Sequence, residues 1–408
     1  MRTQPLKTNL KRFAKKTGLS LLHGVLLLLL TALALNIDYN FGPEETLVKS
    51  TVFLDELLHK RKDYTSDFVF IDVSASKQLI DRPDRGGNQA ITDRAMLTRF
   101  FKAIAKKQQY QKTVLCDLMF DQPTISDDSL KYFLFRTEGI IIPYSKENNR
   151  SILPVFNDIT QGYSGYKRSK GVYSSDNLVK YQYVNGSGEK TIPLKMAEHT
   201  MGMESDYKLG LLWLGENIFF NSIIYEKYIG MSDIQNTESG SKMIPLDEIV
   251  ILLESNNDDF IEKFTRDKYI IIGDFENDLH QTYNENEPGS LIIANLLISL
   301  KLGTNQITFG WIIFMLICFS LLSAIILFPT KSIISALERM KETTIGVMVL
   351  EFFTFFLITG LISFLSFIFF RKHIDIFFVS IYLTGISLIK EYFNERNNKK
   401  NAKANSAH

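Results

Sequence analysis

The chain has 408 residues and a formal net charge of +1, because 46 lysines and arginines nearly balance 45 aspartates and glutamates. This balance excludes the strongly basic class of nucleic-acid-binding proteins, so we expect no nucleic-acid partner. The two cysteines, Cys116 and Cys318, fall in a predicted buried strand and in a predicted membrane segment. They are not expected to pair, so the middle of the chain must be stabilised by a hydrophobic core of its own.

Four apolar segments are long enough to cross a lipid bilayer, since a transmembrane helix needs about 20 predominantly apolar residues. In chain order they are residues 19–37, 309–328, 344–370 and 374–389. The pattern predicts one span, a large domain over 38–308 and then three more spans. A cleaved signal peptide is the alternative for the first segment, because Ala32-Leu33-Ala34 has a small–x–small pattern. The length of that segment favours a retained anchor.

Basic residues near the spans predict the orientation. Residues 1–18 contain six lysines and arginines and no acidic residue. Because basic loops tend to stay in the cytoplasm, we expect 1–18 and the tail 390–408 inside and 38–308 outside. The loop after the second span agrees with this through Lys331, Arg339 and Lys341. A short outer turn with Arg371 and Lys372 is the exception.

The region after the first span begins with an amphipathic segment, within residues 38–65, that predicts a helix leading away from the membrane. Short apolar runs of the buried-strand kind follow it, and they alternate with helical patterns at 92–109 and from about Ser126 or Asp127. The runs are residues 68–73, 113–119, 139–143 and 269–273. Such alternation predicts an α/β domain with a mainly parallel sheet and helices on both faces.

Residues 150–245 differ in composition and are rich in Tyr, Ser, Gly and Asn. Alternating patches around the turn at 185–188 indicate a hairpin. We therefore expect an antiparallel and partly helical insertion that covers one edge of the sheet. The apolar segment 289–302 predicts a helix that approaches the membrane before the second span.

Several short motifs in this order resemble the CHASE domain of the second type, a sensory extracellular domain associated with cyclases and histidine kinases. They are FVFIDVS, ITDRAMLTRFFKAI, TVLCDLMFDQP, KYIIIGDFENDLHQT and PGSLIIANLLISLKLG. The matching positions in them are Asp72, Arg94, Asp117, Phe120, Asp121, Lys268, Gly273, Asp278, Pro288, Gly289, Ala294 and Asn295. The three closing spans complete the resemblance, which covers roughly residues 20–390.

The resemblance implies a sensory role in the inner membrane of a bacterium, and two departures qualify it. A polar segment at 81–91 replaces the tryptophan and prolines that usually precede the arginine. Members usually continue into a cytoplasmic kinase, cyclase or phosphodiesterase domain, whereas the tail 390–408 is short and polar. We therefore expect the chain to act through a separate protein partner in the membrane or cytoplasm, with a homodimer as a further possibility.

Aspartates follow the ends of the predicted parallel strands, where open α/β sheets bind ligands. Asp72, Asp117 and Asp274 stand at strand ends, and Asp121 and Asp278 lie on the loops that follow. The cluster predicts a site for a cation or an amine-bearing ligand. The alternative is that these carboxylates cap helices and loops. Arg94 either pairs with one of them or forms an ion pair on the surface.

No nucleophile or water-activating histidine accompanies the aspartates, so we expect neither an enzyme nor a cofactor. The six histidines show no metal-ligand spacing. Glu351, in the third span, is an ionisable residue in a hydrocarbon environment and is expected to meet a polar group, with His23 as one candidate. The alternative is a shallow position near the inner interface.

Two functions remain as hypotheses from the sequence. The first is a membrane-anchored sensor that binds an unidentified extracytoplasmic ligand and signals through its partner. The alternative is a structural or scaffolding subunit of a cell-envelope complex, with an apolar or aromatic assembly surface. A transporter component has only Glu351 in its favour.

Overall fold

The computed structural model describes residues 4–37, 39–58, 63–82, 87–105, 111–147, 150–156, 158–165, 170–172, 177–235, 242–255, 258–282, 285–328 and 344–405. The chain divides into two compact units. The helical unit comprises Met1–Asp55, Lys170–Ser174 and Ile307–His408. The α/β unit comprises Glu56–Ser169 and Ser175–Gln306.

A seven-stranded sheet forms the centre of the α/β unit, in the order β15-β2-β16-β5-β6-β7, with β8 paired to β6. All neighbours run parallel except β7, which is antiparallel to β6. The strands are β2 (Phe68–Asp72), β5 (Thr113–Cys116), β6 (Ile140–Glu147), β7 (Arg150–Ile152), β8 (Gln161–Tyr163), β15 (Met243–Pro245) and β16 (Tyr269–Gly273). The four predicted strands are present, and the predicted mainly parallel sheet is confirmed.

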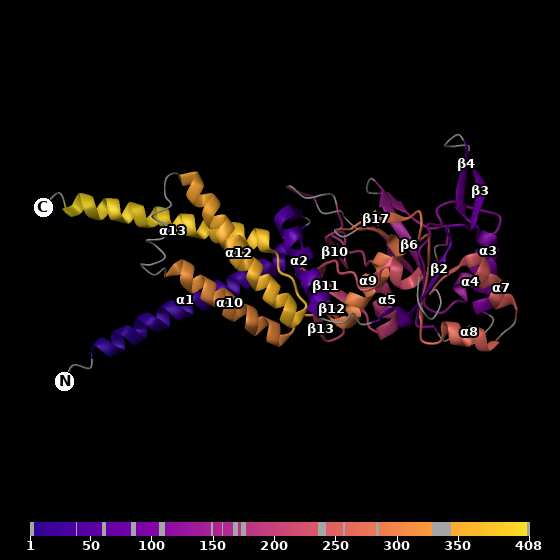
Figure 1. Cartoon of the computed structure of the whole chain (residues 1–408), viewed down its shortest axis with the longest axis horizontal. Coiled ribbons are helices and arrows are strands. Elements are labelled where there is room, and N and C mark those ends of the chain that lie inside the picture. The colour runs from indigo at the N-terminus through magenta and orange to yellow at the C-terminus, as the bar shows by residue number, and fades with distance from the viewer. Residues whose placement is uncertain are drawn as a thin grey trace. The chain divides into compact units, whose positions relative to one another are not determined.

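Helices cover both faces of this sheet, which explains why its central strands are continuously apolar. In Figure 1, β2 and β6 stand between α5 (Ile192–Met201) and α9 (Gly289–Leu302) on one side and α3, α4 and α7 on the other. The second group comprises α3 (Arg94–Ala105), α4 (Asp127–Phe135) and α7 (Leu246–Glu254). Alternate strand residues such as Ile71, Cys116 and Ile272 join that group in one hydrophobic core. Asp93 begins α3 by accepting hydrogen bonds from the N–H groups of Ala95 and Met96.

The helix predicted at 289–302 is α9, and it is a core helix of the α/β unit. Every residue from Gly289 to Leu300 is buried. A helix that is apolar all round is buried either in a protein core or in a membrane, and the sequence alone does not separate the two. The core explains the apolar sequence that we attributed to an approach to the membrane.

Antiparallel elements surround the sheet, and several depart from the prediction. The described residues of the polar segment 81–91 belong to a hairpin of β3 (Lys77–Arg82) and β4 (Gly87–Thr92). The turn at 185–188 is present and closes a short antiparallel bridge between Val184 and Lys190, after which the chain begins α5 instead of continuing a longer strand. The insertion also does more than cover an edge, because it supplies β7, β8 and β15 to the sheet. Its other strands within the α/β unit are β10 (Lys180–Gln182), β11 (Ser205–Lys208), β12 (Leu211–Leu214), β13 (Asn217–Phe220) and β14 (Ser222–Ile224).

Smaller elements complete the α/β unit. A second hairpin, formed by β17 (Leu279–Gln281) and β18 (Asn286–Pro288), leads directly into α9. The strand β13 is hydrogen-bonded to the last residues of the unit, since the Phe220 N–H donates to the Asn305 carbonyl over 2.9 Å. The remaining helices are η1 (Thr65–Asp67), α6 (Met231–Gln235) and α8 (Asp258–Thr265).

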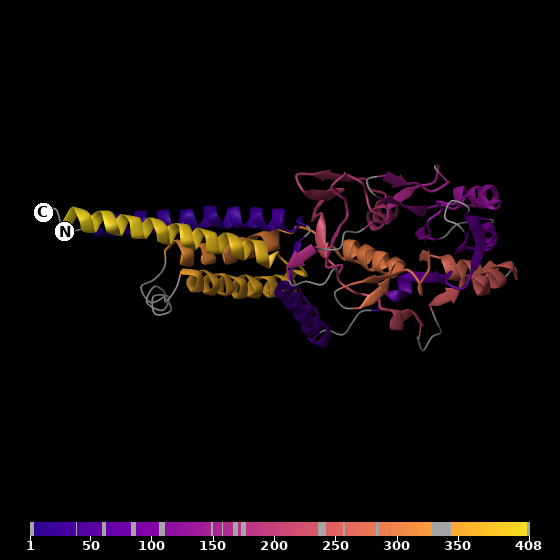
Figure 2. The ribbon, with the colours of Figure 1, turned by 90° about the horizontal axis from the view of Figure 1, so that it is seen from above.

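Among the described residues, four helices of the helical unit are long and apolar enough to cross a membrane, in agreement with the predicted number of spans. They run side by side in both views (Figure 1, Figure 2). The candidate spans are Phe13–Ala34 of α1 (Gln4–Ala34), all of α10 (Phe309–Leu327), Met348–Phe370 of α12 (Thr344–Phe370) and Ile376–Asn394 of α13 (Ile376–Asn405). The residues predicted as a tail from 390 continue α13 as helix to Asn405. The loop with Lys331, Arg339 and Lys341 lies outside the described residues.

Small and polar side chains bring these helices together. A Cβ at Gly24 of α1 would lie only 2.7 Å from the Ser320 Oγ of α10, so glycine allows close contact there. Trp311 donates from its indole N–H to the Ser366 Oγ over 2.9 Å. The ammonium group of Lys390 donates to the carbonyls of Ile326 and Leu327, over 2.7 and 2.9 Å, and so caps the end of α10.

The predicted helix after the first span is α2 (Gly42–Leu58), and it does not simply lead away from the spans. Its first turns pack on α12 and α13. Leu47 lies against Gly360, where an added Cβ would come within 3.2 Å of the leucine Cδ2. The Glu44 carboxylate accepts a 2.8 Å hydrogen bond from the Ile376 N–H at the start of α13. The strands β1 (Tyr39–Phe41) and β9 (Lys170–Val172) pair in parallel in the same unit.

Candidate functional site

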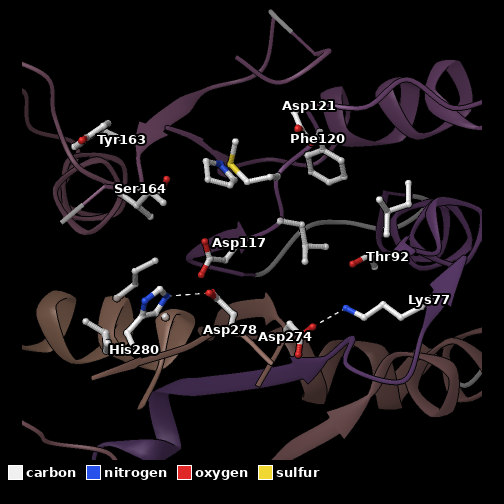
Figure 3. Close-up of a pocket in the computed structure, with 18 of the residues that line it drawn as sticks. Lys77, Thr92, Asp117, Phe120, Asp121, Tyr163, Ser164, Asp274, Asp278 and His280 are labelled. Atoms are coloured by element: carbon white, nitrogen blue, oxygen red, sulfur yellow. Dashed lines mark hydrogen bonds and ion pairs between the residues drawn. The ribbon is translucent and has the colours of Figure 1, made fainter. Parts of the chain in front are cut away.

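A cavity of about 380 Å³ opens in the α/β unit beyond the carboxyl ends of β5 and β16 (Figure 3). Open α/β sheets bind ligands at this edge. Its walls come from the β3–β4 hairpin, the segments after β5, β8 and β16, and the first turns of α9. The polar and aromatic lining residues are Lys77, Gln89, Thr92, Arg94, Asp117, Phe120, Asp121, Tyr163, Ser164, Tyr181, Asp274, Asp278 and His280.

Five of the six predicted site residues line this cavity, and they are Arg94, Asp117, Asp121, Asp274 and Asp278. Asp72 is not among the lining residues. Its carboxylate accepts hydrogen bonds from the backbone N–H of Ser74 at 3.0 Å and of Phe275 at 3.2 Å. Asp72 therefore holds two loops together, which corresponds to the loop-binding alternative.

Asp117 is half-buried at the end of β5, where its carboxylate accepts a 2.8 Å hydrogen bond from Ser290. Burial, followed by the negative charge of Asp278, raises the pKa of Asp117 to about 7, against the opposing effect of the Ser290 hydrogen bond. Ser290 reaches this position because β16 ends in Gly273. A Cβ at Gly273 would lie 1.9 Å from the Ser290 Oγ.

Asp278 and His280 form a second polar pair at the cavity wall, with 2.9 Å between the Asp278 Oδ1 and the His280 Nε2. Burial raises the pKa of Asp278, and the charge of Asp274 adds to this rise. Burial also lowers the pKa of His280, so the imidazole is neutral near pH 7 and does not cancel a carboxylate charge. Gly289 makes room for the pair, since a Cβ there would lie 2.7 Å from the Asp278 Oδ2.

Asp274 is held in its ionised form. Burial alone would raise its pKa, but the Lys77 ammonium at 2.6 Å and the Asn277 N–H outweigh this effect and lower the pKa. Lys77 comes from β3, in the hairpin that the sequence analysis did not predict. Figure 3 shows this ion pair and the Asp278–His280 contact on the same side of the cavity.

Arg94 is buried, and its partner is neither a cluster aspartate nor a surface residue. Its guanidinium forms an ion pair with Asp127 at the start of α4 and lies 5.2 Å from the centre of the Phe120 ring. The Asp127 carboxylate also accepts a 2.7 Å hydrogen bond from the Thr124 N–H. Arg94 thus fixes the loop that carries Asp121, and both of our predictions for its partner were wrong.

The lining has more negative than positive charge. Lys77 and Arg94 already bind carboxylates, whereas no lysine or arginine of the described residues pairs with Asp117, Asp121 or Asp278. The described part of the chain contains no group of three or more His, Cys, Asp or Glu side chains that could hold a metal ion. The arrangement suits an organic cation, because aromatic side chains line the cavity together with the carboxylates.

The two predicted polar residues of the membrane spans belong to the helical unit and bind different partners. His23 contacts the Ser323 Oγ through its Nδ1 at 2.7 Å and the Tyr382 hydroxyl through its Nε2 at 3.2 Å. Glu351 is buried and accepts a 3.2 Å hydrogen bond from Ser387 of α13. The suggested Glu351–His23 pair is therefore not formed.

Sequence reasoning missed Lys77, Ser290 and His280 as members of the site. Only His280 had a visible signal, its closeness to Asp278 in the sequence. No protein-family model matches the chain, no curated protein is significantly similar to it, and no solved structure matches its fold. The resemblance to the CHASE domain of the second type stays a prediction.

Proposed function

We propose that the chain is a membrane-anchored sensor whose α/β unit binds a small organic cation in the cavity beyond β5 and β16. The observation that carries this proposal is the surplus of carboxylates around an open cavity. Three of them, on Asp117, Asp121 and Asp278, lack a lysine or arginine partner among the described residues. A bound ammonium group would supply that partner and lower the cost of holding these charges close together.

The size and chemistry of the cavity are consistent with such a ligand. Its volume of about 380 Å³ lies within the range of small-molecule sites, which is about 300–1,000 Å³. Tyr163 and Tyr181 line it beside the carboxylates. Aromatic faces attract ammonium groups, so these rings would favour alkylated amines over metal ions.

We infer that the α/β unit lies outside the inner membrane and that both chain termini lie in the cytoplasm. The six basic residues within 1–18 support this orientation. A membrane-impermeant maleimide tests it on intact spheroplasts, in a chain whose own Cys318 is replaced by serine. The variant Asp158→Cys, at a position that is exposed in the α/β unit, should react with the maleimide before the membrane is permeabilised. The variant Lys15→Cys should react only after permeabilisation, and the reverse order would overturn the orientation.

Signal transfer in this proposal runs from α9 to α10. The first turn of α9 lines the cavity, and α10 begins seven positions after the last residue of α9, at Phe309. The connection is held by β13, because Asn305 donates to the Phe220 carbonyl and Gln306 to the Asn217 side chain, both over 2.7 Å. A ligand shifts the spans only if it binds one arrangement of α9 better than another.

Thermal unfolding of the full chain in lipid nanodiscs tests ligand binding. Putrescine and choline are the cationic probes, and glutamate is the anionic control. A probe at 100 times its dissociation constant should stabilise the folded chain by about 2.7 kcal/mol, which is readily detected as a rise in melting temperature. The rise should be lost in Asp278→Asn and kept in Asp158→Asn, which removes a charge outside the cavity. Equal rises in both variants, or none with any cation, would contradict the proposal.

A structural subunit is the second candidate, and exposed apolar side chains on the β11–β12–β13 meander favour it. Leu209 is 96% exposed at the tip of the β11–β12 turn and has a positive φ of 55°. Trp213 and Tyr207 are also exposed. If this surface is an assembly contact, a stoichiometric partner should co-purify from native membranes and be lost in Leu209→Asn. Leu79→Asn, which changes an exposed leucine of β3, is the matched control.

A further inference from the structure

Three lysines gather at the end of the central sheet that is opposite to the cavity, where β16 begins with Tyr269. Lys112 and Lys268 directly precede β5 and β16, which are neighbours in the sheet. The backbone N–H of Lys112 donates to the carbonyl of Lys268 over 2.8 Å, so the two lysines start side by side. Lys301 lies in the last turn of α9, whereas the first turn of α9 lines the cavity.

Asp67, the last residue of η1, is the carboxylate that these three lysines face. Burial alone would raise its pKa, but the lysines outweigh this effect and lower the pKa. The ammonium group of Lys301 forms an ion pair with Asp67 at 2.9 Å, and that of Lys268 donates to the Ser66 carbonyl. Among the described residues, Lys112 and Lys268 form no ion pair with a carboxylate. The cluster therefore has a surplus of positive charge.

The hydroxyl of Tyr269 lies next to this cluster and is buried without a hydrogen-bond partner. The residue is 0% exposed, and its oxygen forms no hydrogen bond with the described residues. The ammonium groups of Lys301 and Lys112 lie 4.8 and 5.3 Å from the centre of its ring. A buried hydroxyl without a partner costs free energy, and an ammonium group cannot accept its proton. The partner that this hydroxyl lacks is therefore a hydrogen-bond acceptor.

We propose that this end of the sheet binds a small oxyanion, a phosphate or sulfate group, between Tyr269, Lys112 and Lys301. The anion accepts the hydrogen bond of the Tyr269 hydroxyl and neutralises the surplus charge of the lysines. Lysine is a common phosphate ligand, and its flexible side chain lets the ammonium groups move apart to admit the anion. This site does not depend on the cavity, because it takes a ligand of opposite charge at the other end of β16.

Titration of the full chain with inorganic phosphate, and separately with sulfate, tests the proposal through the melting temperature. The chain is held in dodecyl maltoside, which has no phosphate group of its own to compete for the site. Sodium chloride keeps the ionic strength constant, and each anion stays below about 10 mM, because concentrated phosphate and sulfate stabilise folded proteins non-specifically. The melting temperature should rise with the anion and reach a plateau, as binding to one site requires.

The variant Tyr269→Phe removes only the hydroxyl and should raise the half-saturating anion concentration about tenfold, since hydrogen bonds to charged groups are strong. Without the anion its melting temperature should not fall, because the lost hydroxyl has no partner to leave unpaired. Lys112→Gln should also weaken binding. Tyr132→Phe and Lys131→Gln, which change exposed residues of α4, are the matched controls and should leave the half-saturating concentration unchanged.

Two results would overturn the proposal. The first is a melting temperature that shows no saturable rise with either anion. The second is a rise with the same half-saturating concentration in Tyr269→Phe as in the unmodified chain, because the anion would then bind elsewhere.

Discussion

The hydroxyl of Ser290 donates a 2.8 Å hydrogen bond to the carboxylate of Asp117, and this contact joins the first turn of α9 to the end of β5. The two residues are far apart in the sequence and belong to different layers of the α/β unit. Asp117 lines the cavity, and Ser290 lies in the first turn of α9, which lines the same cavity. The ionisation of Asp117 is therefore linked to the position of α9.

We expect the stability of the folded chain to fall as the pH rises through about 7, with Asp117 as one cause. Its pKa is raised to about 7 in the folded state, whereas an aspartate in an unfolded chain has a pKa near 3.9. Between these values the folded state binds more protons, so the contribution of Asp117 is complete below about pH 4 and is lost above about pH 7. Thermal unfolding of the full chain between pH 5 and pH 8 measures this loss. Asp117→Asn should lose less stability over that range, and an unchanged pH dependence would refute the assignment.

The variant Ser290→Ala should extend the loss of stability to higher pH. The hydrogen bond from Ser290 lowers the pKa of Asp117, so its removal raises that pKa further above 7. The pH at which the melting temperature stops falling should therefore be higher than in the unmodified chain. Ser290→Thr, which keeps a hydroxyl, is the control for the hydrogen bond. A midpoint that shifts downward in Ser290→Ala would contradict the described contact.

Gly273→Ala should destabilise the α/β unit by about 1–3 kcal/mol, as added atoms in a packed core do. The new Cβ would meet the Ser290 Oγ at 1.9 Å, and α9 would have to move away from β16. The measurement is chemical denaturation of the full chain, followed by circular dichroism. Gly186→Ala is the matched control, because a Cβ at Gly186 would meet nothing within 4 Å. Similar losses in both variants would show that the close approach of α9 is not the cause.

Two arginines of α3 allow a comparison of a buried ion pair with an exposed one. Arg94 is 2% exposed and pairs with Asp127, and its replacement by alanine leaves a carboxylate without its cation. We expect Arg94→Ala to cost about 3–5 kcal/mol of unfolding free energy. Arg99 pairs with Glu254 on the surface, so Arg99→Ala should have a much smaller effect. Equal losses in chemical denaturation would mean that the burial of Arg94 is not what matters.

Much of the fold could be predicted because it depends on local patterns. The four spans follow from length and hydropathy, and the central strands from short apolar runs between helical patterns. The grouping of Asp117, Asp274 and Asp278 follows from one rule, that parallel strands end at the same edge of a sheet. These inferences do not require knowledge of which residues meet at a distance.

The rest depends on contacts between distant segments. The β3–β4 hairpin has a polar sequence, so Lys77 showed no strand signal, and its partner Asp274 is 197 positions away. The pairing of Arg94 with Asp127 depends on how α3 and α4 pack, which no local pattern gives. The partners of His23 lie on α10 and α13, and several hydroxyl residues of those spans were equally good candidates.

The attachment of Gln306 to β13 limits how the two units can move. Only two residues separate Gln306 from the first residue of α10, and a chain extends by at most about 3.6 Å per residue. The chain from Gln306 to the first residue of α10 is therefore at most about 11 Å long. So short a connection leaves little slack, and a displacement of β13 reaches the first residue of α10 unless the hydrogen bond between Gln306 and Asn217 breaks.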